Sequence, residues 1–145
     1  MKGVIFAPLD SVDDALARAL DAAGLPTDDL HEPGRAFFRL SDDAGAIGFV
    51  GIEGIGVDRL LRSLVVLPRR RRQGFGALLV NHAEASARQD GTERLHLLTQ
   101  TSSDFFHAHG YRRAERSSAP ASIGSTAQFT SLCPASAAYL VKDLA

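Results

Sequence analysis

The stretch of sequence that decides the fold is Arg69-Arg70-Arg71-Arg72-Gln73-Gly74-Phe75-Gly76. An apolar run over residues 60–67 precedes it, and an amphipathic helical pattern over residues 77–87 follows it. Two glycines let the backbone turn tightly and approach a ligand closely, and the free N–H groups at a helix start point back at that ligand. Such a start carries roughly +0.5 of an elementary charge, to which the arginines add. The stretch therefore predicts a strand, a basic turn and a helix that together bind a pyrophosphate.

Length and composition predict one soluble, cytoplasmic domain spanning residues 1–145. The chain has 145 residues, of which 45% are hydrophobic and 23% charged, and its formal net charge is −1. A chain of this size buries enough surface to fold without disulfides or metals. Its only cysteine, Cys133, excludes an internal disulfide and any site built from several cysteines. The near-zero charge gives no reason to expect nucleic acid, and no apolar run is long enough to span a membrane.

Apolar periodicity and turn residues predict a mixed α/β chain with a mostly antiparallel sheet. After a short apolar start at residues 4–6, the predicted strands cover residues 36–40, 46–53, 60–67, 94–99, 111–116 and 135–141. The predicted helices cover residues 12–23, capped by Asp10-Ser11, then 75–89 and 103–110, with a weaker helical stretch at 123–132. No internal repeat interrupts this order, so one layered domain is expected.

The spacing Arg71-x-x-Gly74-x-Gly76, after a strand and at a helix start, resembles the acetyl-CoA signature of the GNAT superfamily of N-acetyltransferases. The consensus of that signature is Gln/Arg-x-x-Gly-x-Gly/Ala. The preceding segment 64–68 matches the usual strand and proline, and segment 105–111 is similar to a later aromatic-x-x-x-Gly-aromatic element. The resemblance covers about residues 59–116. It implies a GNAT-like fold: a single three-layer domain in which helices flank a central mixed sheet, with the cofactor entering between segments 60–67 and 94–99.

Three further segments look like the branch of this superfamily that is associated with arsenic-resistance gene clusters. They are residues 60–66, 97–99 and 132–137. That branch is named by gene neighbourhood more than by chemistry. Its resemblance suggests a small amine-bearing substrate, such as an amino-acid-like toxic compound.

The superfamily resemblance assigns the cofactor-binding residues. Backbone groups of the strand would pair with the pantetheine arm of acetyl-CoA, and N–H groups of the turn would hold its pyrophosphate. The residues so assigned are Leu64, Val65, Val66, Arg71, Arg72, Gln73, Gly74, Phe75, Gly76 and Ala77. The competing interpretation of the arginine run is a solvated basic turn or a nucleic-acid patch, and Gly74 and Gly76 at a helix start favour the phosphate of CoA.

The chemistry of acetyl transfer also needs a base, because an alkyl amine with a pKa near ~10 arrives protonated at neutral pH. Glu53 is the candidate base, since it ends the strand expected to pair with residues 60–67; a solvent-facing charge is the equal alternative. His96 is a weaker candidate, because imidazole titrates near neutrality. Arg62 and Ser63 are candidate substrate-binding residues: an arginine here can pair bidentately with a carboxylate, or simply face outward.

One departure from the family concerns the departing thiolate. Many relatives place a tyrosine four residues before the late glycine, and this chain has Phe106 there. The thiol would leave as thiolate, take its proton from water, or use Tyr139 or a serine of the tail. No metal site is expected from the scattered histidines or from Cys133, which is interpreted as a buried free thiol.

The leading hypothesis is therefore a GNAT-fold enzyme that transfers acetyl from acetyl-CoA to a primary amine of a small molecule. The alternative is a catalytically weak CoA-binding regulatory module of the same fold, motivated by Phe106 and the uncertain base. Nucleic-acid binding through residues 69–72 ranks third, because aromatic stacking residues are not interleaved with the arginines. A homodimer through the predicted strand at residues 135–141 is also expected from the resemblance.

Overall fold

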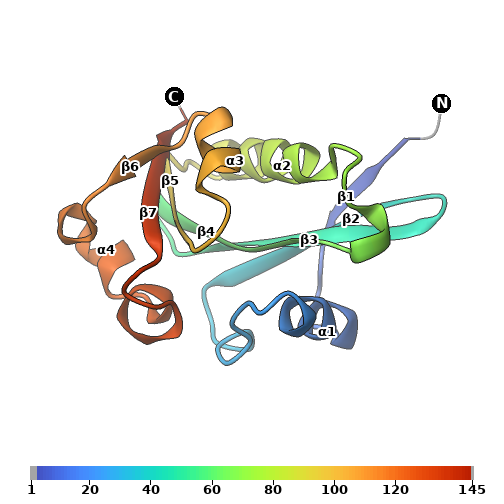
Figure 1. The fold of residues 1–145 in the computed structure, drawn as a ribbon, viewed down its shortest axis with the longest axis horizontal. Helices are drawn as coiled ribbons and strands as arrows, with labels where there is room; N and C mark the ends of the chain where they lie inside the picture. Colours follow the sequence, from blue (N-terminus) through green and yellow to red (C-terminus); the bar gives the residue numbers. More distant parts are fainter. Residues whose placement is uncertain (1–2, 145) are drawn as a thin grey trace.

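The computed structural model describes residues 3–144, and its centre is a seven-stranded sheet with helices on both faces (Figure 1). The strand order is β1-β2-β3-β4-β5-β7-β6. Neighbouring strands are antiparallel except for β4 and β5, which run parallel. The strands are β1 (Ile5–Pro8), β2 (Arg35–Asp42), β3 (Gly45–Glu53), β4 (Asp58–Val66), β5 (Arg94–Thr99), β6 (Arg112–Ala114) and β7 (Ala138–Asp143). The predicted mixed, mostly antiparallel sheet is confirmed.

The helices form the outer two layers of the domain. They are α1 (Asp14–Ala22), α2 (Phe75–Gln89), α3 (Ser103–Ala108) and α4 (Ala121–Gly124). Helices α2 and α3 lie over one face of the sheet, and α1 and α4 lie on the opposite side (Figure 1). The predicted three-layer arrangement is therefore confirmed.

Alternation along the strands supplies a separate core for each face. In β2, Phe38 packs into the α2 side of the sheet together with Leu79, whereas Phe37 packs on the α1 side with Leu16. Both Leu16 and Leu79 are fully buried. The two cores fix the sheet between its helices, so the positions where β4 and β5 meet are held from both sides.

The first helix begins later than the sequence pattern indicated. Asp13, not the predicted Asp10-Ser11 pair, caps α1, and its carboxylate accepts a hydrogen bond of 2.8 Å from the backbone N–H of Leu16. Asp10 and Asp13 both precede apolar residues at helical spacing, and only the hydrogen-bond geometry of the folded chain separates them.

The C-terminal third also differs from the prediction. The expected strand at 111–116 shortens to β6, because Tyr111 is buried and its N–H bonds back to Phe106 at the end of α3. The expected helical stretch at 123–132 divides into α4 and a π-helical turn, Gln128–Leu132. The expected strand at 135–141 begins only at Ala138, and it lies between β5 and β6 rather than at an edge. Both of its edges are paired, so this strand is not free to add to a second copy of the sheet.

Within residues 3–144, no helix has both the length and the apolar character needed to cross a bilayer.

Candidate active site

The basic turn leads into α2 through a left-handed residue. Gly74 caps α2 with φ at 81° and ψ at 9°, a conformation that L-residues rarely adopt. A Cβ atom at this position would meet nothing within 4 Å, so the glycine is required by its backbone and not by crowding. Gly76 is different, because its added Cβ would lie 3.3 Å from the ring of Phe105 on α3. The first N–H groups of α2 therefore open onto a surface that α3 borders.

The arginines of the turn have unequal surroundings. Arg70 forms an ion pair with Asp42 and lies over the ring of Phe75, 5.3 Å from its centroid. Arg71 is exposed and its Nε donates a 3.0 Å hydrogen bond to the carbonyl of Val66. Arg72 is also exposed and adopts a positive φ of 65°. Arg70 thus fastens the turn to β2, while Arg71 and Arg72 stay at the surface beside the start of α2.

Strands β4 and β5 separate just before this turn. They pair over only three positions, from Asp58 opposite Arg94 to Leu60 opposite His96. Beyond Leu60, β4 stays paired with β3 on its other side. The backbone of Val65 and Leu67 faces β3, since Leu67 N–H bonds to the carbonyl of Ile47. Successive residues of a strand point to opposite edges, so the N–H and C=O of Val66 face the opening.

A bulge in β4 lies at the opening. The register between β3 and β4 shifts between Phe49 and Gly51, and Ser63 adopts a positive φ of 57°. Positive φ is unusual for a residue other than glycine and asparagine, and bulges turn the local backbone away from regular pairing. Ser63 and Leu64 therefore present backbone and side-chain groups to the space between β4 and β5.

That space is a cavity of about 310 Å³. Its walls come from the end of α1 and the next turn (residues 23–26), from β4 (61–64), from β5 and the following loop (97–102), and from Phe106, Gln128, Leu132, Cys133 and Ala137. Phe106 lies on the α3 side and Gln128 on the α4 side of the sheet. The cavity thus passes through the sheet at the point where β4 and β5 diverge.

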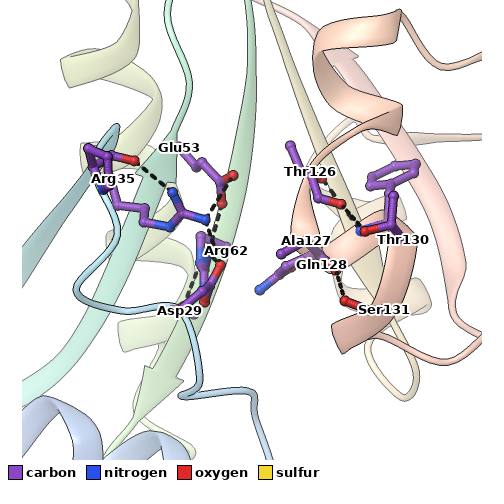
Figure 2. Close-up of polar contacts among 12 residues, drawn as sticks. Asp29, Arg35, Glu53, Arg62, Thr126, Ala127, Gln128, Thr130 and Ser131 are labelled. Atoms are coloured by element: carbon purple, nitrogen blue, oxygen red, sulfur yellow. Dashed lines mark hydrogen bonds and ion pairs between the residues drawn. The ribbon is translucent and has the colours of Figure 1, made fainter.

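Arg62 is at the centre of a buried ion cluster beside the cavity (Figure 2). Its guanidinium, with a side chain 0% exposed, donates to both oxygens of Asp29 at 2.6 and 2.7 Å and to Glu53 at 2.7 Å. A second cation, Arg35, donates to Asp29 at 2.8 Å and lies 3.4 Å from Glu53. The cluster contains two cations and two anions, so its charges balance.

The cluster shifts the pKa of its members. Burial alone would raise the pKa of Asp29, but hydrogen bonds and charge from Arg62 and Arg35 outweigh it and lower that pKa to about 2. Burial would lower the pKa of Arg62, and its two carboxylate partners reverse this and raise it. Gly51 makes room for the arrangement, because a Cβ there would lie 2.7 Å from the Phe37 ring and 3.3 Å from Cγ of Arg62.

A second polar chain joins three strands on the same side of the sheet. His96 Nε2 lies 2.8 Å from the carboxylate of Asp58, and His96 Nδ1 lies 2.7 Å from the hydroxyl of Tyr139. Burial lowers the pKa of His96, although Asp58 opposes this shift. A neutral imidazole fits these contacts when Nε2–H donates to Asp58 and Nδ1 accepts from Tyr139. Arg94 also donates to Asp58, at 2.7 and 3.0 Å.

The structure brings together the residues that the sequence proposed as catalytic or substrate-binding, because Arg62 donates to Glu53 at 2.7 Å and to Ser63 at 3.2 Å. Arg62 and Ser63 line the cavity, but Arg62 is held by Asp29 and Glu53. Glu53 is 7% exposed and is not among the residues that line the cavity. Phe106 lines the cavity.

Two contributors were not found from sequence. Asp29 lies in a turn and meets Arg62 across 33 positions of sequence, and Gln128 reaches the cavity from the π-helical turn. Neither residue has a local spacing signal that marks it. Cys133 was noted only as a free thiol; burial raises its pKa, and it lies on the cavity wall.

Among residues 3–144 there is no group of three or more histidine, cysteine, aspartate or glutamate side chains placed to hold a metal ion.

The family is established by comparison with known proteins. Residues 33–113 match the family model described as an acetyltransferase (GNAT) domain. This match covers more than half of the chain, and the chain belongs to the GNAT acetyltransferase family.

Individual relatives agree with this membership. An uncharacterized N-acetyltransferase of Chlorobaculum tepidum is 40% identical over 63 residues, which are 43% of this chain and 40% of the relative. The N-acetylglutamate synthase of Neisseria gonorrhoeae, solved with coenzyme A and N-acetyl-glutamate, has a TM-score of 0.74 at 19% identity. The alignment covers 97% of this chain but only 35% of that enzyme. A GNAT-family acetyltransferase of Staphylococcus aureus has a TM-score of 0.74 at 14% identity, covering 97% of this chain and 100% of the other.

Proposed function

We propose that this chain is an acetyl-CoA-dependent N-acetyltransferase that acts by direct transfer on a primary amine of a small molecule. The observation that carries the proposal is the short pairing of β4 and β5, over three positions, next to the glycine-capped start of α2. Family membership and the fold shared with a CoA-bound synthase support it. The chain spans well under half of the length of that synthase, so the substrates of the larger protein are not transferred to it.

The residues present fit acetyl-CoA as co-substrate. A diphosphate at the start of α2 would accept hydrogen bonds from the backbone N–H groups of residues 74–77. Gly74 provides the left-handed backbone conformation that this turn requires. Arg71 and Arg72 are exposed beside it and supply positive charge. The Val66 backbone, which faces the opening, matches an amide-bearing arm lying alongside β4 as an added strand. Acetyl-CoA supplies the activated acetyl group.

The cavity positions the acceptor amine. Its volume of about 310 Å³ is at the small end of ligand sites, which favours a small molecule. Ser63 and Leu64 at the bulge border the point where the cavity meets β4, so a backbone N–H of this segment is proposed to polarise the thioester carbonyl. Phe106 carries no proton for the sulfur, and thiolate release or protonation by water is proposed there. The hydroxyl of Tyr139 is held by His96 and does not line the cavity.

Glu53 stays our proposal for the general base, and its contacts determine the route by which it would take the proton. Its carboxylate is ion-paired with Arg62 and does not line the cavity, so proton removal would run through water. Arg62 and Ser63 stay our proposed substrate-binding residues. Ser63 would contact the substrate through its hydroxyl. The guanidinium of Arg62 is already bonded to Glu53 and Asp29, so this residue would act by holding the cavity wall in place.

Three finer points belong to the same proposal. Segments 60–66, 97–99 and 132–137 support a place in the branch associated with arsenic-resistance gene clusters. A cytoplasmic location is part of the same proposal. A homodimer would use a surface other than the edges of β7, which are both paired.

The test is product formation. Purified protein with acetyl-CoA and a panel of amino acids, aminophosphinates, polyamines and aminoglycosides should release CoA with at least one amine and yield the N-acetylated product by mass spectrometry. Binding of acetyl-CoA without transfer to any amine would instead indicate the regulatory module.

A further inference from the structure

The structure points to an oxygen-recognising subsite at the α4 end of the cavity, built on Gln128. We propose that this subsite binds a carboxylate or another oxyanion of the acceptor molecule, so that the acceptor is an anionic or zwitterionic amine and not a polycation. The inference rests on the proposed acetyl transfer and narrows its substrate class.

The first observation is an unused donor. Gln128 is 4% exposed and lines the cavity, and its Oε1 accepts a hydrogen bond from the Cys133 thiol at 3.8 Å. In this orientation the amide oxygen faces the thiol, and the amide nitrogen is turned away from it. Its Nε2 donates to no described residue, and Figure 2 shows this nitrogen turned toward Arg62 and Asp29, across the cavity from its own helix. Because Gln128 lines the cavity, this amide nitrogen can donate to an oxygen of a ligand bound there.

The second observation is where the backbone places this side chain. Gln128 begins a π-helical turn, in which the N–H of Cys133 donates a 3.0 Å hydrogen bond to the carbonyl of Gln128. Wider turns of this kind are rare and are frequently found at functional sites. The turn is held by side-chain hydroxyls, with Thr130 and Ser131 donating to the carbonyls of residues 126 and 127 at 3.0 and 3.2 Å (Figure 2). The donor is thus carried on a fixed element.

The third observation is the charge of the cavity. Among the described residues that line it, none is an aspartate or glutamate, and the one charged residue is Arg62. The Arg62 charge is balanced by Asp29 and Glu53, which in turn share Arg35. Ser63 Oγ accepts from Arg62 Nε at 3.2 Å and keeps its own proton to donate.

A polycationic acceptor needs carboxylates in the site, and this lining offers donors instead. Two exposed acids, Asp21 and Asp28, border a separate outer hollow that shares residues 24–26 and Leu132 with the cavity wall. They are placed to meet an ammonium group at the entrance and not inside. The donor pair Gln128 and Ser63, next to the bulge of β4, therefore selects for an oxygen-bearing end of the acceptor.

The experiment measures the melting temperature of the CoA-bound protein with four small amines of one or two carbons. Glycine and aminomethylphosphonate carry an oxyanion, glycinamide carries a neutral amide, and ethylenediamine carries a second cation. We expect the oxyanion probes to raise the melting temperature at concentrations at which ethylenediamine does not, with glycinamide between them. Stabilisation by ethylenediamine equal to or above that by the oxyanion probes would overturn the proposal, as would the absence of any shift with both oxyanions.

Variants assign the effect to the residue. Gln128→Met should weaken oxyanion binding roughly tenfold or more, since one hydrogen bond to a charged group is lost, and leave CoA binding unchanged. Gln128→Glu, which keeps the shape and adds a repelling charge, serves as the second variant and should abolish the oxyanion shift. Gln89→Met, exposed at the end of α2, is the matched control. Unchanged oxyanion binding in either Gln128 variant refutes the assignment. A protein that does not bind CoA at all refutes the proposed function itself.

Discussion

Replacing Arg62 with methionine tests whether this residue stabilises the fold or binds substrate. Methionine keeps much of the aliphatic volume and removes three hydrogen bonds to carboxylates, of 2.6–2.7 Å. Asp29 and Glu53 would then share only Arg35 while staying buried. Breaking a buried ion pair by removing one partner costs about 3–5 kcal/mol. With an unfolding entropy of about 2.1 cal/mol/K per residue, a domain of this length loses about 0.3 kcal/mol of stability per degree, which gives a fall in Tm of about 10–17 °C.

The assay is calorimetric or denaturant unfolding of both proteins at pH 7 and again at pH 4. At the lower pH the two carboxylates of the variant can take protons, so its deficit relative to wild type should shrink. Arg39→Met is the matched control, because Arg39 is 44% exposed and its ion pair with Asp13 is 3.8 Å long. That variant should lose no more than about 0.5 kcal/mol.

Two results would refute the reasoning. One is a stability loss below about 1 kcal/mol for Arg62→Met, since an arginine held only by substrate would cost the free protein little. The other is a deficit that does not depend on pH, because it would show that the lost contacts are not with carboxylates.

Four other predictions concern residues of the site. Burial lowers the pKa of His96 below its ordinary value of 6.5, so the unfolded state binds the proton at a higher pH than the folded state does. The free energy of unfolding should therefore fall as the pH drops below about 6.5. His96→Gln should remove this dependence on pH. Asp29, with its pKa lowered to about 2, should add a second loss between pH 3.8 and 2, which Asp29→Asn removes. Gly74→Val, which strains a φ of 81°, should raise KM for acetyl-CoA roughly tenfold and leave that of the amine unchanged. Glu53→Gln should lower kcat, because proton removal from the amine is lost; an unchanged kcat would show that Glu53 is not the base.

Local sequence signals predicted the parts of the fold that local geometry controls. Gly74 and Gly76 marked the turn and the start of α2, and apolar periodicity marked the strands that form the centre of the sheet. The separation of β4 from β5 was expected from the family resemblance and is present, with three paired positions. These features depend on residues close together in the chain.

Interactions between distant segments were not predictable in the same way. Asp29 and Arg62 are 33 positions apart, and Asp58, His96 and Tyr139 come from three strands. Arg62 was therefore interpreted as pairing with a substrate carboxylate or facing outward, since nothing near it in the sequence reveals Asp29 as its partner. The insertion of β7 between β5 and β6 is likewise a property of the whole sheet.

The most direct test of the central claim is the melting temperature of the protein with acetyl-CoA. Saturation to about 100 times the dissociation constant should add roughly 2.7 kcal/mol of stability, which at about 0.3 kcal/mol per degree is a rise of about 9 °C. Gly76→Glu, which places a carboxylate beside the start of α2 and against Phe105, should abolish the rise. No rise in the wild-type protein at millimolar acetyl-CoA would contradict the assignment of the β4–β5 opening as a CoA site.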